Sequence, residues 1–260
     1  MMAACSTPKV EEVEGTSTVE LDGYSVSWIS DTPEPRNNSL ELFPTASKEL
    51  ADSLGLQEGI PASMSAFLLR SEDGDILFDA GLGAPFSQLQ PRLSALGVAP
   101  EDIEYVFITH LHHDHVGGLM AQDSTAAFPN AKLYLRKAEC EAWSEMPAEK
   151  TAGLFGILGL YADRTVLFDA GETLPLGVEA IDAAGHTPGH TIFRKGNLLI
   201  AGDVMHAVAL QMADPAINAV YDMDQEKAAA TRVQVVSFAR ENGLLLCGMH
   251  FPEPGFIDFR

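Results

Sequence analysis

The sequence predicts a single α/β domain. Its 260 residues lie near the upper end of what one domain usually holds. Short runs rich in β-forming residues alternate with helix-like segments, and no run of about 18 apolar residues suggests a membrane span. Neither an internal repeat nor a domain linker is visible. We therefore expect a flexible N-terminal segment, residues 1–19, followed by one domain over residues 20–260.

The first half of the chain contains four β-rich runs and two helical segments. Strands are expected over residues 24–30, 65–70, 75–81 and 105–110. A helix is expected over residues 86–97. The segment from residue 30 to about 62 is rich in Pro and Asn and is too long for a simple connector. We interpret it as a loop that carries a short helix near residues 48–55 and covers the functional site.

The second half continues the alternation of strands and helices. Strands are expected over residues 131–137, 165–170, 177–183, 191–196, 197–203 and 243–249. Helix-like segments cover residues 138–143 and residues 224–242, and the second of these is rich in helix formers.

The composition excludes some classes of partner. The chain has 16 Lys and Arg against 37 Asp and Glu, a formal charge of -21, which repels nucleic acid and anionic lipid surfaces. We expect a soluble protein. Cys5, Cys140 and Cys247 are an odd number at unrelated spacings, which argues against a disulfide framework. Cys247 lies near His250, but we expect it to pack in the core rather than bind a metal.

The N-terminus allows two interpretations. MMAAC followed by a polar stretch is similar to the end of a bacterial lipoprotein signal, with Cys5 as the lipidated residue. The residues before Cys5 cannot supply the apolar region of about 7 to 15 residues that such a signal needs. We expect a periplasmic or lipid-anchored protein if the native N-terminus is longer, and a cytoplasmic protein otherwise.

The histidines predict a metal site. All eight fall in four short segments: His110, His112, His113 and His115 in THLHHDHVGGL, His186 and His190 in AGHTPGH, His206 in AGDVMH, and His250 in CGMHFPEPGF. Imidazoles must converge from separate loops to bind one or two transition-metal ions. Four histidines and one aspartate within six residues are difficult to explain as packing.

The HxHxDH motif suggests two ligand pairs. It follows a predicted strand and precedes a turn at Val116–Gly118. Residues two apart at a strand end project to the same side, so we expect His110 and His112 to bind one ion. Asp114 and His115, around the turn, would then face a second ion.

The other histidine segments and Asp203 are expected to complete the ligands of both ions. A zinc-type site needs about four ligands, one of which is water if the site is catalytic. We predict that His186 completes the first set, that His250 serves the second, and that Asp203 bridges both ions. His113 is expected to face solvent. His190 is expected to be a hydrogen-bond partner of the site rather than a ligand.

Beyond this motif, the sequence resembles the metallo-β-lactamase superfamily, whose fold is an αββα sandwich of two mixed β-sheets flanked by helices. The order and spacing of six segments are similar to the methyl parathion hydrolase branch, which also includes quorum-quenching lactonases. The segments are LFDAGLG (77–83), THLHHDHVGGLM (109–120), FPNAKLYLRKAE (128–139), AGHTPGH (184–190), GDVMHAVALQMADPAI (202–217) and HFPEPGF (250–256). The resemblance covers roughly residues 20 to 256.

The resemblance implies two divalent metal ions, with zinc favoured and manganese, iron or cobalt as alternatives. It implies the same ligands as the reasoning above: His110, His112 and His186 on one ion, Asp114, His115 and His250 on the other, and Asp203 between them. It also implies that Asp79 orients the metal-binding loop. The chain ends at Arg260, where relatives often continue with another strand, so the closing edge of the C-terminal sheet is left open.

These features predict a binuclear hydrolase in which a metal-bridging hydroxide attacks an ester, with lactones as the leading substrates and phosphotriesters next. Asp114 would accept a proton and help it to reach the leaving group. His206 lies three residues after Asp203, where lactonases of the branch that the sequence resembles have a tyrosine positioned to contact the substrate carbonyl. The resemblance implies that His206 would likewise donate a hydrogen bond to the developing oxyanion, unless it packs against the following helix. The expected partner is a small-molecule substrate, and a homodimer is left open.

Several alternatives belong to the same superfamily. A mononuclear iron sulfur dioxygenase could keep the motif, whereas di-iron relatives usually carry Glu at the position of His112. A glyoxalase II-like thioester hydrolase usually presents basic residues to glutathione, and this chain has no basic cluster. A β-lactamase is disfavoured, because the resemblance lies elsewhere. Trp28, Phe67, Phe251 and Phe256 are candidates for pocket walls, but they fit a core equally well.

Overall fold

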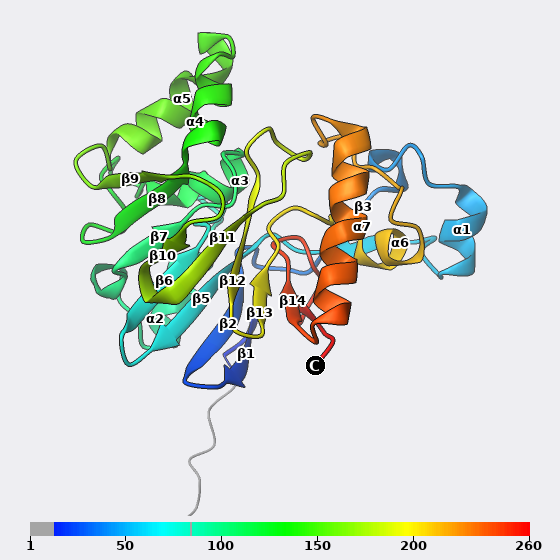
Figure 1. The fold of residues 1–260 in the computed structure, drawn as a ribbon, viewed down its shortest axis with the longest axis horizontal. Helices are drawn as coiled ribbons and strands as arrows, with labels where there is room; N and C mark the ends of the chain where they lie inside the picture. Colours follow the sequence, from blue (N-terminus) through cyan, green and yellow to red (C-terminus); the bar gives the residue numbers. More distant parts are fainter. Residues whose placement is uncertain (1–12, 84) are drawn as a thin grey trace, which may run out of the picture.

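Two β-sheets packed face to face form the centre of the protein (Figure 1). The structure, a computed structural model, describes residues 13–83 and 85–260. The first sheet contains, in spatial order, β1 (Thr16–Leu21), β2 (Tyr24–Ser30), β5 (Ser65–Ser71), β6 (Gly74–Phe78), β7 (Tyr105–Phe107), β8 (Lys132–Arg136) and β9 (Thr165–Phe168). Its first four strands pair antiparallel, and β6 to β9 pair parallel.

The second sheet contains six strands in sequence order. They are β10 (Thr173–Leu174), β11 (Val178–Asp182), β12 (Thr191–Lys195), β13 (Leu198–Ile200), β14 (Leu245–Cys247) and β15 (Phe256–Asp258). All of its pairs are antiparallel except β13 with β14. Because β11, β13 and β14 run in the same direction, the loops that follow them meet at one edge of the sheet.

Helices cover the outer faces of both sheets and complete an αββα sandwich. The first sheet is flanked by α2 (Leu89–Ala95), α3 (His113–Val116), α4 (Lys137–Ser144) and α5 (Ala148–Gly159), and the second by α7 (Gln225–Glu241). Short 3-10 helices lie at Leu40–Leu42, Pro100–Asp102, Gly117–Leu119 and Pro175–Gly177. The predicted fold class is therefore confirmed.

The central strands are buried on both faces, and alternate side chains enter different cores. In β5, Phe67 and Leu69 face the core between the sheets, whereas Ala66 and Leu68 face the outer core beneath the helices. Side chains of the second sheet alternate in the same way. In β14, Leu246 faces α7, whereas Leu245 and Cys247 face the core between the sheets. Burial of each large apolar side chain contributes about 1.5 to 3 kcal/mol, so these strands hold the loops at their ends in fixed positions.

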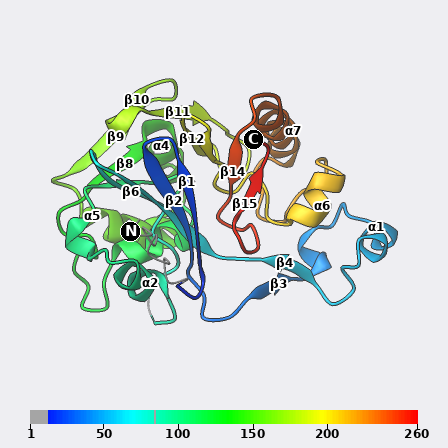
Figure 2. The same cartoon turned by 90° about the horizontal axis from the view of Figure 1, so that it is seen from below.

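A separate arm precedes β5. It contains β3 (Arg36–Asn38) and β4 (Ile60–Ala62), which pair as a ribbon, and α1 (Lys48–Ser53), which packs against α6 (Val208–Ala213) through a small apolar core (Figure 2). The segment that contains this arm was predicted to cover the functional site. Arg36 and Asn38 of the β3–β4 ribbon do line the cavity described below. The short helix α1 does not line it, because its apolar face packs against α6.

The domain begins earlier than predicted. β1 starts at Thr16 and pairs along its whole length with β2, so the expected boundary at residue 20 is wrong. The polar sequence of this strand suits an edge strand, which is why it was assigned to the flexible segment. Residues 1–12, including Cys5, lie outside the described residues. At the other end, β15 pairs antiparallel with β14 and is the outermost strand on that side of the second sheet among the described residues.

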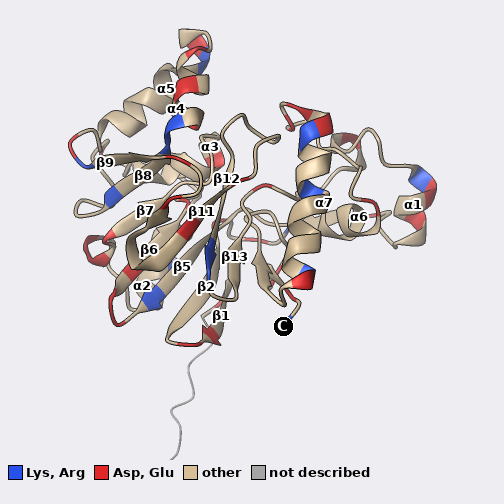
Figure 3. Cartoon of the chain, viewed as in Figure 1, with Lys and Arg blue, Asp and Glu red and all other residues tan. Residues whose placement is uncertain are grey.

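The composition also led to predictions about the charged surface, membrane spans and Cys247. Figure 3 shows Asp and Glu spread over loops and helices, with Lys and Arg scattered among them. Over residues 13–83 and 85–260, no helix is both long and apolar enough to cross a bilayer. Cys247 is buried in the inter-sheet core, and burial raises the pKa of its thiol.

Candidate metal centre

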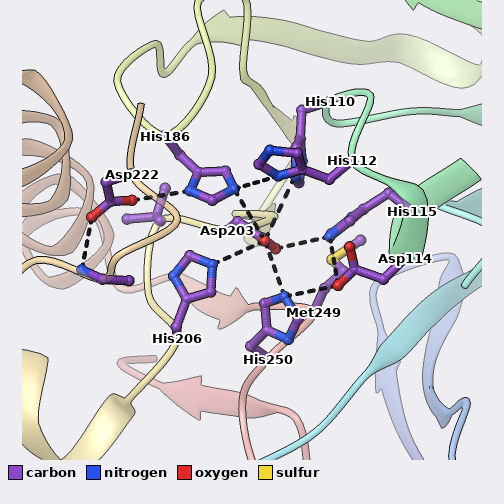
Figure 4. Close-up of polar contacts among 12 residues, drawn as sticks. His110, His112, Asp114, His115, His186, Asp203, His206, Asp222, Met249 and His250 are labelled. Atoms are coloured by element: carbon purple, nitrogen blue, oxygen red, sulfur yellow. Dashed lines mark hydrogen bonds and ion pairs between the residues drawn. The ribbon is translucent and has the colours of Figure 1, made fainter. Parts of the chain in front are cut away.

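All seven predicted ligands meet at one edge of the sandwich (Figure 4). They come from the four loops that follow β7, β11, β13 and β14. The histidine motif, however, does not extend a strand as predicted. β7 ends at Phe107, and His110 and His112 lie in the loop before α3, so loop conformation rather than strand alternation brings them together. His113 is exposed, as predicted.

Three imidazole nitrogens face one another in a first group. Nδ1 of His112 lies 2.9 Å from Nε2 of His110 and 2.9 Å from Nε2 of His186. The use of Nδ1 by His112 and of Nε2 by the other two could not be foreseen from spacing. Three imidazoles with convergent nitrogens form one face of a tetrahedral metal site.

A second group lies beside the first and contains Asp114, His115 and His250. An oxygen of Asp114 lies 3.7 Å from Nε2 of His115 and 3.4 Å from Nε2 of His250. Asp114 and His115 are consecutive residues in the single turn of α3, and their side chains approach each other beside His250.

Asp203 lies between the two groups. Its Oδ2 lies 3.6 Å from Nε2 of His110 and 3.4 Å from Nε2 of His186, both in the first group. Its oxygens also lie 3.0 Å from His250 and 3.2 Å from His115, both in the second group. The backbone has a positive φ at Gly202, just before Asp203. One carboxylate therefore contacts ligand atoms of both groups.

A buried aspartate orients two of the histidines. Asp79 accepts hydrogen bonds from the backbone N–H and the hydroxyl of Thr109, and its Oδ2 lies 2.6 Å from Nδ1 of His115. Since the Thr109 hydroxyl donates to Asp79, it accepts from Nδ1–H of His110, 3.0 Å away. Both imidazoles therefore direct Nε2 into the centre, and Asp79 makes the contacts implied by the resemblance.

Two further partners, which the sequence did not indicate, orient the other Nε2 ligands. Nδ1 of His186 lies 3.0 Å from Asp222, and Nδ1 of His250 lies 2.8 Å from the carbonyl oxygen of Ser63. Asp222 is itself held by the fully buried guanidinium of Arg232, 3.2 Å away. No local motif marks Asp222 or Arg232, since an aspartate in a loop and an arginine in a long helix are usually solvated.

Charges in the second group shift several pKa values. Burial raises the pKa of Asp203, but nearby imidazoles, foremost His115 and His250, outweigh burial and hold it well below its usual value. Burial lowers the pKa of His115, but the carboxylates of Asp203, Asp79 and Asp114 raise it well above its usual value. Burial also lowers the pKa of His250, but the carboxylates of Asp203 and Asp114 outweigh burial and raise it to about 8.

Two histidines of the first group, His110 and His112, have pKa values shifted in the opposite direction. Burial and the neighbouring His186 lower the pKa of His112 to about 3, and burial holds the pKa of His110 well below its usual value. Burial also lowers the pKa of His206 to about 4, although Asp203 opposes this change. These imidazoles are neutral at pH 7 and offer lone pairs, the form in which histidine binds a metal.

Unsatisfied atoms inside the cluster test whether a metal fits. Nε2 of His115 and Oδ1 of Asp203 are buried and lie 3.2 Å apart, within ion-pair distance, yet neither makes a well-formed hydrogen bond with any described residue. Buried polar atoms that are not hydrogen-bonded are costly and rare in native proteins. A pair of such atoms facing each other among His and Asp side chains fits the coordination shell of a divalent cation.

His190 and His206 have different surroundings. Nε2 of His190 accepts a hydrogen bond from the backbone N–H of Asp203, 3.0 Å away, so His190 is a hydrogen-bond partner of the cluster, as predicted. Nε2 of His206 lies 3.1 Å from Oδ2 of Asp203, and its backbone N–H donates to Gln211. The His206 ring stacks on the His250 ring, with centroids 4.8 Å apart.

The cluster lines a cavity of about 320 Å³. Its other walls include side chains that were not predicted to line it: Arg36, Asn38, Met64, Leu82 and Tyr221. They come from the β3–β4 ribbon and from loops after β4, β6 and α6. Among these segments, only the loop after β6, which contains Leu82, belongs to a motif noted in the sequence, LFDAGLG.

The aromatic candidates for the pocket walls are core residues instead. Trp28 and Phe67 are buried between the sheets, and Phe251 is buried beneath α7. Phe256 packs against the inter-sheet core from β15. None of the four lines the cavity beside the metal cluster.

Comparison with known proteins places the chain in a family. The model of the "Metallo-beta-lactamase superfamily" matches residues 60–250. The chain belongs to this superfamily. Over 142 residues it is 30% identical to a hydroxyacylglutathione hydrolase of Aeromonas hydrophila, covering 54% of this chain and 45% of that protein. Over 147 residues it is 29% identical to an N-acyl homoserine lactonase of a Bacillus species, covering 48% and 54% respectively. The chain thus spans about half the length of these relatives.

Solved structures of this superfamily resemble nearly the whole chain. A crystal structure of the hydrolase AbOPH superposes with a TM-score of 0.81 and 27% identity, covering 95% of this chain and 94% of that one. AidC, a dizinc quorum-quenching lactonase with a bound product, superposes with a TM-score of 0.84 and 22% identity, covering 94% and 93%. The relatives and neighbours named here are hydrolases by name, and this superfamily member has a His and Asp cluster able to hold metal.

Proposed function

We propose that the protein is a binuclear metal-dependent hydrolase that opens lactone or ester bonds. The observation that carries the proposal is the position of Asp203 between two groups of convergent ligands. His110, His112 and His186 would hold one ion, and Asp114, His115 and His250 the other. Zinc is the favoured metal, because the ligands are imidazole and carboxylate and a dizinc lactonase has the same fold.

Bound in this cluster, two divalent ions would supply a water-derived nucleophile at neutral pH and a Lewis acid for the carbonyl oxygen. The chain's own residues would do the rest. Asp79, Asp222 and Ser63 hold the imidazoles in the required orientation. Asp114 lies at the cavity wall and is partly exposed, so it can accept a proton and deliver it to the leaving group.

His206 is the proposed contact with the substrate. It lines the cavity, and its neutral imidazole can donate a hydrogen bond to an oxygen that becomes negative in the transition state. In the structure its Nε2 is directed at Asp203. The role therefore requires that substrate compete with Asp203 for this N–H or that Nδ1 carry the proton.

Lactones are the proposed substrate class, with phosphotriesters as the next candidates. The cavity wall mixes apolar and polar groups, such as Met64, Leu82 and Asn38, and contains one basic side chain, Arg36, among the residues that line it. The similarity to N-acyl homoserine lactonases supports the same class.

A second candidate is a thioester hydrolase of the hydroxyacylglutathione type, which is favoured by the 30% identity to the Aeromonas enzyme. Glutathione conjugates carry several charges, however, and a single arginine at the cavity offers few partners for them.

Metal analysis combined with a substrate panel tests the proposal. The panel contains an acyl-homoserine lactone, an aryl ester, a phosphotriester, an acyl-glutathione thioester and a β-lactam. We expect two metal ions per chain and the highest kcat/KM with the lactone. A single iron ion with oxygen consumption would replace the proposal with the sulfur dioxygenase alternative. Preference for the thioester would support the second candidate.

A further inference from the structure

Glu139 is a buried carboxylate that the proposed mechanism does not use. It lies in the first turn of α4, and its residue is only 2% exposed. No described Lys, Arg or His forms an ion pair with it; instead, four hydrogen-bond donors surround its two oxygens. Three of these donors come from other segments and one, Trp143, from the same helix. Burying a carboxylate is costly unless such donors surround it, so its contacts indicate what it does.

Each oxygen of Glu139 joins a different part of the site. Oε1 accepts from the backbone N–H of Leu111, 3.0 Å away, and from the indole N–H of Trp143, 2.7 Å away. Oε2 accepts from the hydroxyl of Thr187, 2.9 Å away, and from the backbone N–H of Gly189, 2.6 Å away. The carboxylate therefore ties the loop after β7 to the loop after β11.

These contacts reach all three histidines of the first group. Leu111 lies between His110 and His112 in the chain, and Thr187 directly follows His186. The ring of Trp143 also packs edge-on against His112, with centroids 5.6 Å apart and an interplanar angle of 85°. The loop approaches so closely that a Cβ at Gly189 would lie 2.4 Å from the backbone nitrogen of Glu139.

The second group is supported by other residues. Asp79 holds His115, and the carbonyl oxygen of Ser63 holds His250. Neither is a partner of Glu139. Asp79 also reaches His110 of the first group through Thr109, but, of the two groups, the contacts of Glu139 lie beside histidines of the first only. From these contacts we infer that Glu139 is a positioning residue that sets the spacing of the first group and so controls the affinity for one of the two ions. This inference rests on the proposed binuclear function.

Glutamine is the sharpest substitution at this site, because it keeps the shape and removes the charge. Each oxygen of Glu139 faces one backbone N–H, that of Leu111 or that of Gly189, and neither can become an acceptor. Whichever way the amide of Glu139→Gln is turned, its NH₂ group meets one of these donors. One of the two loops must then move away from residue 139. The ring nitrogens of His110, His112 and His186 would no longer all point at one metal position.

Stepwise zinc binding, measured by competition with a chromophoric chelator, tests the inference. Wild type should bind two ions. Glu139→Gln should bind one of them 10- to 100-fold more weakly, the usual effect of losing a group that orients metal ligands. Glu141→Gln is the matched control, since Glu141 lies on the same helix with an exposed side chain. It should bind both ions as wild type does.

Two background variants identify the affected ion. In His250→Ala, which leaves the first group intact, adding Glu139→Gln should weaken binding of the remaining ion by the same factor. In His112→Ala, which leaves the second group intact, adding Glu139→Gln should have no effect. If Glu139→Gln does not fold, Thr187→Val and Trp143→Phe each remove one donor and should show a smaller loss confined to the first group.

The outcomes separate the inference from the proposed function. If wild type binds fewer than two ions, the binuclear function fails. If wild type binds two ions and Glu139→Gln binds both as tightly as wild type does, only the positioning role fails. If Glu139→Gln is unfolded, wild-type affinity for both ions in Thr187→Val and in Trp143→Phe leads to the same conclusion. Equal weakening in the two background variants would show that Glu139 stabilises the domain in general, and this too would overturn the inference.

Discussion

The stability of the metal-free protein should pass through a maximum near pH 6.5. The pKa of His250 rises from 6.5 to about 8 because Asp203 and Asp114 outweigh its burial. A group whose pKa is higher in the folded state stabilises that state fully below pH 6.5, and this stabilisation is lost as the pH rises through about 8. His206, whose pKa falls to about 4, has the opposite sign, so its burial destabilises the fold as the pH falls below 6.5.

The size of the high-pH decline follows from these values. The difference between 6.5 and about 8 corresponds to about 2 kcal/mol of unfolding free energy from His250. His115, whose pKa is also raised, adds a loss of the same sign. Urea unfolding of chelator-treated protein at pH 6, 6.5, 7.5 and 8.5 measures this decline.

Two comparisons make the test specific. His250→Asn should remove the part of the decline that comes from His250. Zinc-saturated protein should show the reverse slope, because the unfolded imidazoles take up protons at low pH while the bound ones do not. A metal-free protein whose stability stays level or increases between pH 6.5 and 8.5 would refute the charge balance described for the second group.

Three further predictions concern single residues of the site. Asp203→Asn should lose at least one metal equivalent and abolish turnover while the fold persists, and a variant with two ions and more than half of wild-type kcat would exclude the bridging role. His112→Ala should lose metal and activity together, whereas His113→Ala should have far less effect because His113 is exposed; the reverse order, measured by metal content and kcat/KM, would show that the motif is assigned incorrectly. His206→Ala should keep both ions and lower lactone kcat/KM by about 10- to 1,000-fold, with partial recovery in His206→Tyr. Wild-type kinetics in the alanine variant, or loss of an ion from it, would contradict a substrate contact.

The ligand cluster could be predicted because metal binding depends on particular residue types, above all histidine. The chain has only eight histidines, and all of them lie in four short segments that follow predicted strands, which is difficult to explain without a shared site. The strands themselves were visible as apolar runs, and most of the predicted ones are present. What failed was local geometry. The predicted strand alternation of His110 and His112 is replaced by a loop, although both still reach the same point.

The groups that support the ligands could not be predicted, because burial rather than residue type makes them important. Glu139 and Glu141 lie two positions apart in one helix and look alike in the sequence, yet one is buried under two loops and the other is exposed. Asp222 and Arg232 become partners only when α7 packs against the loop after β13. Such pairs depend on contacts between distant segments, which single-sequence patterns do not encode.

The two groups of predicted ligands have different pKa values, and this difference would affect the order in which the proposed centre takes up its metal ions. His110 and His112 have lowered pKa values and are neutral at pH 7, so an ion can bind them without displacing protons. His115 and His250 have raised pKa values, because protons there balance the carboxylates around Asp203. An ion that enters the second group must release these protons, and its apparent affinity should therefore rise with pH more steeply than that of the first. Under acidic conditions protons should accordingly compete less with metal at His110 and His112 than at His115 and His250. An ion in the first group would also contribute positive charge beside Asp203, lower the pKa of His115 and His250, and so ease binding of the second ion.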